Sequence, residues 1–112
     1  MKEWIDYLTL EEGKHVFGED GGLIAFNVEK KECHITDFYV RPDLRKTGLA
    51  LELAQRAETA AVEQFGCNVL TCNVFINRQN RKSFAYKVKI FSKFGFLPLS
   101  ASHNVVTMIK EL

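Results

Sequence analysis

Features that mark secreted, metal-binding and membrane proteins are missing from this sequence of 112 residues. Its three cysteines, Cys33, Cys67 and Cys72, are an odd number without metal-ligand spacing or a histidine cluster, which argues against a disulfide framework and a metal site. We expect reduced cysteines that pack as small apolar side chains. No apolar run matches a signal peptide or a membrane span. We therefore expect a cytoplasmic protein with no membrane contact.

Proline and linker-like segments are also scarce. The two prolines, Pro42 and Pro98, fall at expected element ends, and no repeat or low-complexity tract interrupts the chain. The chain is 46% hydrophobic and 12% aromatic, which is enough apolar material for a buried core. The expectation is a single domain over residues 1–112.

Negative charge is absent from one long stretch, because no Asp or Glu lies between Glu63 and Glu111. Residues 1–64 carry eight Lys and Arg against thirteen Asp and Glu, a net of −5, whereas residues 65–112 carry seven against one, a net of +6. The overall net charge of +1 provides no field that would steer the chain to nucleic acid or to a membrane. The basic half indicates either an anionic ligand or a solvated helix face, and both remain open.

Hydrophobic periodicity predicts one α/β (α+β) domain. A short amphipathic helix is expected over 2–12. Strands are expected over 15–17, 23–29, 32–40, 68–76, 96–100 and 105–110, and helices over 48–65 and 81–93. The first three strands form an antiparallel meander, the segment 32–76 is a right-handed βαβ unit, and the last two strands form a hairpin.

The strand over 32–40 is expected to lie in the centre of the sheet, because both of its faces carry mostly apolar or small side chains. Simple alternation assigns one face to Cys33, Ile35, Asp37 and Tyr39, and the other to His34, Thr36, Phe38 and Val40.

The junction between this strand and the next helix has the composition of an anion site. A glycine just ahead of a helix exposes unpaired backbone N–H groups, and the helix dipole adds positive potential there. Gly48 and Ala50 permit close approach of a ligand, while Arg45 and Lys46 add charge. The spacing is neither that of a Walker loop nor that of a dinucleotide fingerprint.

This junction resembles the acetyl-CoA loop of the GNAT superfamily of N-acetyltransferases, with the signature Arg/Gln-x-x-Gly-x-Gly/Ala. The matching residues, after Val40 and Pro42, are Arg45, Lys46, Thr47, Gly48, Leu49 and Ala50. The order of expected elements also matches, and Phe94-Gly95-Phe96 looks like the family's Gly-Phe ending to its last helix. The resemblance covers residues 14–112 and implies a GNAT-like mixed sheet.

The resemblance implies acetyl-CoA as the cofactor. The amides of residues 45–50 would hold its pyrophosphate, and the strand edge at Phe38, Tyr39 and Val40 would pair with its pantetheine arm. Asn77 and Asn80 lie where the family often has an asparagine that contacts the cofactor.

Two catalytic candidates follow from the resemblance. His34 occupies the position of the family's frequent glutamate base, and a neutral histidine can accept a proton directly or through water. A histidine bonded to a neighbouring strand is the competing interpretation. Where the family commonly has a tyrosine that acts as the general acid, this sequence has Phe91. Tyr86 on the same helix is therefore the candidate acid, and a core or surface role for Tyr86 is the alternative.

The implied activity is direct transfer of acetyl to an amine of a small molecule or protein in a ternary complex. Cys72 is a nucleophile only in principle, because no histidine is placed beside it. The alternative is a catalytically weakened binding or assembly module for protein or nucleic acid, which Phe91 and the short N-terminal region favour. The stripe of Trp4, Ile5 and Leu8 either covers the sheet or forms a homodimer surface.

Overall fold

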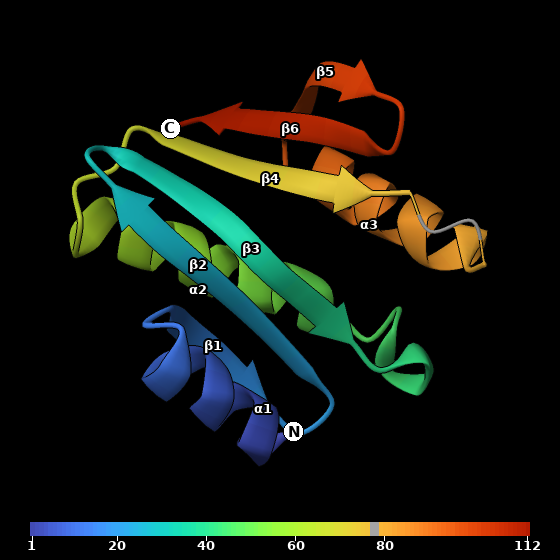
Figure 1. Cartoon of the computed structure of the whole chain (residues 1–112), viewed down its shortest axis with the longest axis horizontal. Helices are drawn as coiled ribbons and strands as arrows, with labels where there is room; N and C mark the ends of the chain where they lie inside the picture. Colours follow the sequence, from blue (N-terminus) through green and yellow to red (C-terminus); the bar gives the residue numbers. More distant parts are fainter. Residues whose placement is uncertain (77–78) are drawn as a thin grey trace.

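The computed structural model describes residues 1–76 and 79–112, and within them one six-stranded sheet organises the chain (Figure 1). The strand order is β1-β2-β3-β4-β6-β5, with only β3 and β4 parallel. The strands are β1 (His15–Glu19), β2 (Gly22–Glu29), β3 (Glu32–Val40), β4 (Val69–Phe75), β5 (Leu97–Ser102) and β6 (Val105–Glu111). The expected mixed α/β fold is confirmed, with its meander, βαβ unit and terminal hairpin.

Two helices, α2 (Leu49–Glu63) and α3 (Arg81–Lys93), pack on one face of the sheet, behind β2, β3 and β4 in Figure 1. Alanines at Ala57, Ala60 and Ala61 allow α2 to approach the strands closely, because they project only a methyl group. Phe26, Phe91 and Phe96 are the largest fully buried side chains of this core. None of the helices in the described residues is both long and apolar enough to cross a membrane.

The N-terminal segment covers part of the opposite face. Helix α1 (Lys2–Asp6) continues into a π-helical turn, η1 (Tyr7–Glu11), so the expected helix over 2–12 is present with a changed second half. Leu8 is 2% exposed and packs with Leu23 and Ala25, joined by the half-buried Ile5. Ile5 and Leu8 therefore cover the sheet, whereas Trp4 stays 39% exposed with its ring centroid 5.9 Å from that of Tyr39.

The alternation expected for β3 is wrong beyond Ile35, because a bulge adds one residue to this strand. Phe26 of β2 is opposite Ile35, but the next β2 residue, Ala25, is opposite Asp37, so Thr36 has no counterpart. The extra residue exchanges the two faces. The buried face consists of Cys33, Ile35, Phe38 and Val40, whereas His34, Asp37 and Tyr39 share the face on which α1 lies.

The attachment of the N-terminal helix depends on its one deeply buried anchor, which gives a stability prediction. Leu8→Ala should lower the free energy of unfolding by about 3 kcal/mol, because it removes buried methyl groups and leaves a cavity. Leu10, which is 77% exposed, is the matched control. Leu10→Ala should change the stability by less than about 0.5 kcal/mol in the same urea titration. Equal losses for the two variants would contradict the packing described.

Candidate functional site

The two parallel strands separate halfway along their length. Their pairing runs from Glu32 opposite Val69 to Ile35 opposite Cys72, and ends there. Beyond that point β3 stays paired with β2, and β4 stays paired with β6 as far as Phe75. The strands are therefore held on their outer sides while their facing edges, over 36–40 and 73–75, lack each other as partners. Such edges leave backbone N–H and C=O groups for a ligand to pair with.

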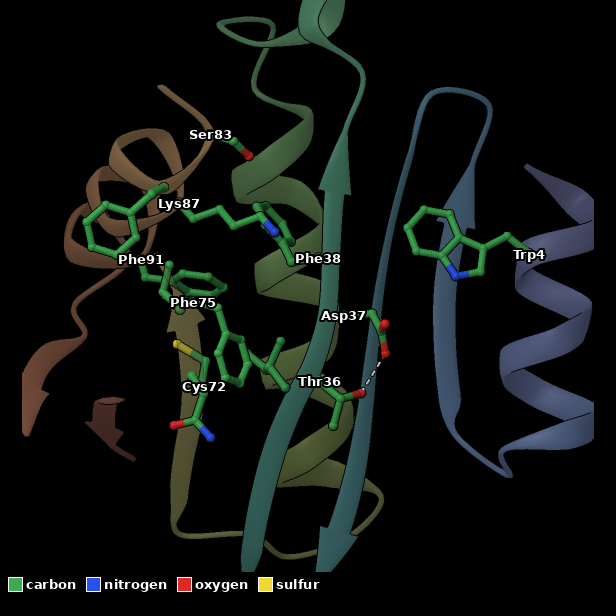
Figure 2. A pocket seen from close by; sticks show the side chains of 13 residues that line it. Trp4, Thr36, Asp37, Phe38, Cys72, Phe75, Ser83, Lys87 and Phe91 are labelled. Atoms are coloured by element: carbon green, nitrogen blue, oxygen red, sulfur yellow. Dashed lines mark hydrogen bonds between the residues drawn. The ribbon is translucent and has the colours of Figure 1, made fainter. Parts of the chain in front are cut away.

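A cleft of about 300 Å³ occupies this separation (Figure 2). Figure 2 shows Trp4 and Asp37 on one side of β3, and Lys87, Ser83 and Phe91 on the other side. The lining is completed by residues of β3, β4 and α3: Ile35, Thr36, Phe38, Cys72, Asn73, Val74, Phe75 and Phe84. Because the strands part here, the cleft is reached by side chains from both faces of the sheet.

A carboxylate held in a fixed position lies on the α1 side of the cleft. Oδ2 of Asp37 accepts hydrogen bonds from Nζ of Lys14 at 2.8 Å and from Oγ1 of Thr36 at 2.8 Å. Burial would lower the pKa of Lys14, but its bonds to Asp37 and to Glu12, the latter at 2.6 Å, outweigh that and raise it. Among the described residues no hydrogen bond to Oδ1 of Asp37 is formed.

A cation faces the cleft from α3. Ser83, Lys87 and Phe91 are four residues apart, so they lie on one side of the helix. Lys87 is half-buried and forms no hydrogen bond or ion pair with any residue in 1–76 or 79–112. Burial lowers the pKa of Lys87, the nearby guanidinium of Arg45 lowers it further, and the carboxylate of Asp37 partly offsets both.

The junction after β3 leads into α2 through strained backbone. Gly48 has φ of +91° and Lys46 has φ of +76°, and a Cβ at Gly48 would meet nothing within 4 Å. Gly48 is the N-cap of α2 and offers no side chain to the first helical amides. The Arg45 side chain turns inward, where Nε donates to the carbonyl of Val40 at 3.1 Å and the guanidinium lies 4.4 Å from the Tyr86 ring centroid.

Comparison with known proteins assigns the chain to a family. The family model described as "Acetyltransferase (GNAT) family" matches residues 2–96. The chain belongs to the GNAT family. Among curated protein sequences, none matches it.

Solved GNAT structures share its fold at low sequence identity. An acetyltransferase of the GNAT family from Desulfovibrio desulfuricans has a TM-score of 0.73 and 15% identity over 98% of this chain and 77% of its own. PaiA N-acetyltransferase from Thermoplasma acidophilum, in complex with coenzyme A, has a TM-score of 0.72 and 17% identity over 99% of this chain and 77% of its own. The N-acetyltransferase PseH from Campylobacter jejuni, in complex with acetyl coenzyme A, has a TM-score of 0.69 and 22% identity over 98% of this chain and 78% of its own.

In this GNAT domain the strand residues expected at the cofactor have different environments. Phe38 lines the cleft, and its ring lies 5.2 Å from that of Phe91. Tyr39 faces Trp4 on the α1 side, and Val40 is buried. Within the junction, Lys46, Thr47 and Gly48 are exposed, whereas Leu49 and Ala50 are buried against the core.

The expected base, His34, lies beside the cleft rather than in it. Its Nδ1 pairs with Oγ1 of Thr71 at 2.5 Å, and its Nε2 lies 3.4 Å from a Glu32 carboxylate oxygen. His34 lines an adjoining hollow of about 250 Å³. That hollow and the cleft have five lining residues in common, namely Ile35, Thr36, Cys72, Asn73 and Phe75.

The expected acid, Tyr86, does not line the cleft either. Burial raises its pKa, and its hydroxyl is buried without a hydrogen-bond partner among the described residues. The structure therefore does not bring His34 and Tyr86 into one cavity. Of the two asparagines, Asn80 caps α3 by accepting a hydrogen bond from the Ser83 amide at 3.1 Å, and Asn77 lies outside the described residues.

Three side chains that line the cleft were not among the site residues predicted from the sequence: Trp4, Asp37 and Lys87. For Lys87 a signal was present, because it is four residues before Phe91 on the predicted helix. For Asp37 the signal was hidden by the bulge at Thr36.

One of the three buried cysteines, Cys72, lines the cleft. Burial raises the pKa of Cys72 to about 12, and that of Cys33 to about 12 as well. A thiol with such a pKa is almost entirely protonated at neutral pH and is a poor nucleophile. Cys72 lines the cleft in this inert form.

Proposed function

We propose that this GNAT domain transfers an acetyl group from acetyl-CoA to a primary amine within a ternary complex. The observation that carries the proposal is the separation of β3 and β4, which opens one cleft to side chains from both faces of the sheet. Two substrates can then meet edge to edge without displacing each other. The donor approaches along the α2 and α3 side, and the amine approaches from the α1 side.

The donor side has the features that coenzyme A requires. The edge over 36–40, which lacks β4 as a strand partner, suits an amide-bearing arm, since such an arm pairs with backbone as an added strand does. The open space over Gly48 and the uncapped amides of α2 suit a diphosphate. When bound, acetyl-CoA supplies an activated thioester. That PaiA and PseH were solved with coenzyme A and acetyl coenzyme A supports this choice of donor.

The acceptor side has the features that a primary ammonium requires. Asp37 already accepts a hydrogen bond from one such group, Nζ of Lys14, and its other oxygen accepts no hydrogen bond among the described residues. The exposed Trp4 ring adds an aromatic face, which attracts cations. We propose that Asp37 and Trp4 hold the amine, and that His34 in the adjoining hollow receives its proton through water.

The transfer needs no covalent enzyme intermediate. The amine nitrogen attacks the thioester carbonyl, the carbon–sulfur bond breaks, and the electron pair remains on sulfur. The protonated state of Cys72 supports direct attack, because the cysteine that lines the cleft is not a thiolate at neutral pH. The acceptor is an amine of either a small molecule or a protein, and comparing acceptors of both kinds distinguishes the two.

Isothermal titration with acetyl-CoA tests the donor site, and two glycines make a matched pair. Gly48 precedes α2 and Gly66 follows it; both have positive φ, +91° and +62°, and a Cβ at either would meet nothing within 4 Å. Gly48→Glu should abolish the binding heat, because it places a negative charge where the helix dipole attracts an anion. Gly66→Glu should bind as the wild type does.

Both variants place a side chain in the left-handed region, so each should lose about 1 kcal/mol of stability, and thermal melts check that the losses are equal. A folded wild-type protein that gives no heat with acetyl-CoA would contradict the proposal. So would loss of binding in Gly66→Glu to the same extent as in Gly48→Glu.

Steady-state kinetics separate the proposed roles of Asp37 and His34. The assay follows thiol release from acetyl-CoA with a lysine-containing peptide, a free peptide N-terminus and an aliphatic polyamine as acceptors. Asp37→Asn should raise KM for the amine about tenfold with little change in kcat, because it removes one charge-assisted contact. His34→Gln should lower kcat about 100-fold with KM unchanged, because it removes a base.

Glu19→Gln, at the exposed end of β1, is the control and should change neither constant. A fall in kcat for Asp37→Asn would make Asp37 the base instead. Wild-type kinetics in His34→Gln would leave His34 as a structural partner of Thr71. A wild-type chain that binds acetyl-CoA but acetylates none of the three acceptors would favour the binding-module alternative.

A further inference from the structure

The half-buried ammonium of Lys87 has no partner that explains its position. It extends from α3 into the cleft and reaches toward Phe38, as Figure 2 shows. It forms no hydrogen bond or ion pair within the described residues, although Asp37 lies close enough to influence it electrostatically. Burying a cation without a paired anion costs free energy. Such a cation is therefore expected where an anion forms or binds.

The surroundings of Lys87 favour an anion other than a phosphate. Four apolar side chains line the same cleft as Lys87: Phe38, Val74, Phe84 and Phe91. The amides that suit a diphosphate belong to a different part of the site, the junction at Gly48. The charged and titratable groups that face Lys87 are Arg45 from the junction, Asp37 from β3 and Cys72 from β4, with Tyr86 adjacent on α3. None of them supplies an anion on the α3 side of the cleft.

The transfer itself creates an anion in the cleft, because breaking the carbon–sulfur bond leaves a thiolate. We propose that Lys87 is the catalytic acid of this enzyme, which stabilises the departing sulfur and donates its proton to it. The inference rests on the proposed acetyl transfer. Lys87 lines the cleft, whereas Phe91 has no proton to give and Tyr86 does not line the cleft.

Protons and electrons are conserved in this transfer. The sulfur keeps the electron pair of the broken bond and takes a proton from the Lys87 ammonium, which becomes a neutral amine. The proton released by the attacking nitrogen reaches His34 and solvent, and solvent restores the Lys87 ammonium. The lowered pKa of Lys87, caused by burial and by Arg45, makes this proton easier to give than that of an exposed lysine.

The test is the pKa of the thiol of free coenzyme A when it is bound to the protein, followed by ultraviolet absorbance of the thiolate across a pH series. A neighbouring ammonium should lower that thiol pKa by about one unit or more relative to coenzyme A in solution. Lys87→Met should restore the solution value. Lys89→Met, an exposed lysine on another side of α3, should keep the lowered value.

Lys87→Arg separates charge from proton transfer. The guanidinium keeps its charge and should keep the bound thiol pKa low, but it does not release its proton, so kcat with acetyl-CoA should fall about 100-fold. Donor thioesters whose thiols are more acidic should recover most of that loss in Lys87→Met and Lys87→Arg, since their sulfur leaves without a proton.

The outcomes distinguish this inference from the proposed function. If the wild type does not bind coenzyme A, both fail. If it binds, and Lys87→Met weakens binding without moving the thiol pKa, Lys87 contacts a phosphate and the inference is overturned. An unshifted thiol pKa in the wild type overturns it equally, while acetyl transfer itself stands.

Discussion

The single residue inserted into β3 at Thr36 sets the geometry on which the site depends. Opposite β2 the insertion is absorbed as a bulge, and at the same point the parallel pairing with β4 ends. A bulge bends its strand and increases the local twist, so we attribute to it the parting of β3 from β4, which stays paired with β6 as far as Phe75. The cleft follows from this parting, because edges that cannot reach each other leave room between them.

The same insertion decides which chemical groups face the cleft. Without it Asp37 would face α2 and the apolar core, where an ionised carboxylate is costly. With it Phe38 enters the core against Phe91, and Asp37 reaches the face on which Lys14 and α1 lie. An acidic side at Asp37 and a cationic side at Lys87 therefore meet across one strand, which matches the −5 and +6 division of charge along the sequence.

Residue patterns predicted the helices and strands and their order, but they did not predict which side chains line the cleft. The helix over 48–65 was predictable, because its alanines and leucines repeat at helical spacing and Gly66 follows them. Alternation along β3 failed after Ile35, since nothing in the sequence marks an inserted residue. Lys87 looked like one of several cations on a basic helix, and only the packing of α3 on β4 directs it inward. The positions of His34 and Tyr86 in separate environments likewise depend on strand pairing and helix rotation.

The most direct test of the account is a titration of the isotope-labelled protein with coenzyme A, followed by amide resonances in solution. The account predicts large shifts for amides of Thr36–Val40 on β3 and of Gly48 and the first turn of α2, since these groups gain hydrogen bonds. Amides of β1 and β5, at the two outer edges of the sheet, should move little. Shifts confined to an outer edge, or none at saturating coenzyme A, would contradict binding between the parted strands.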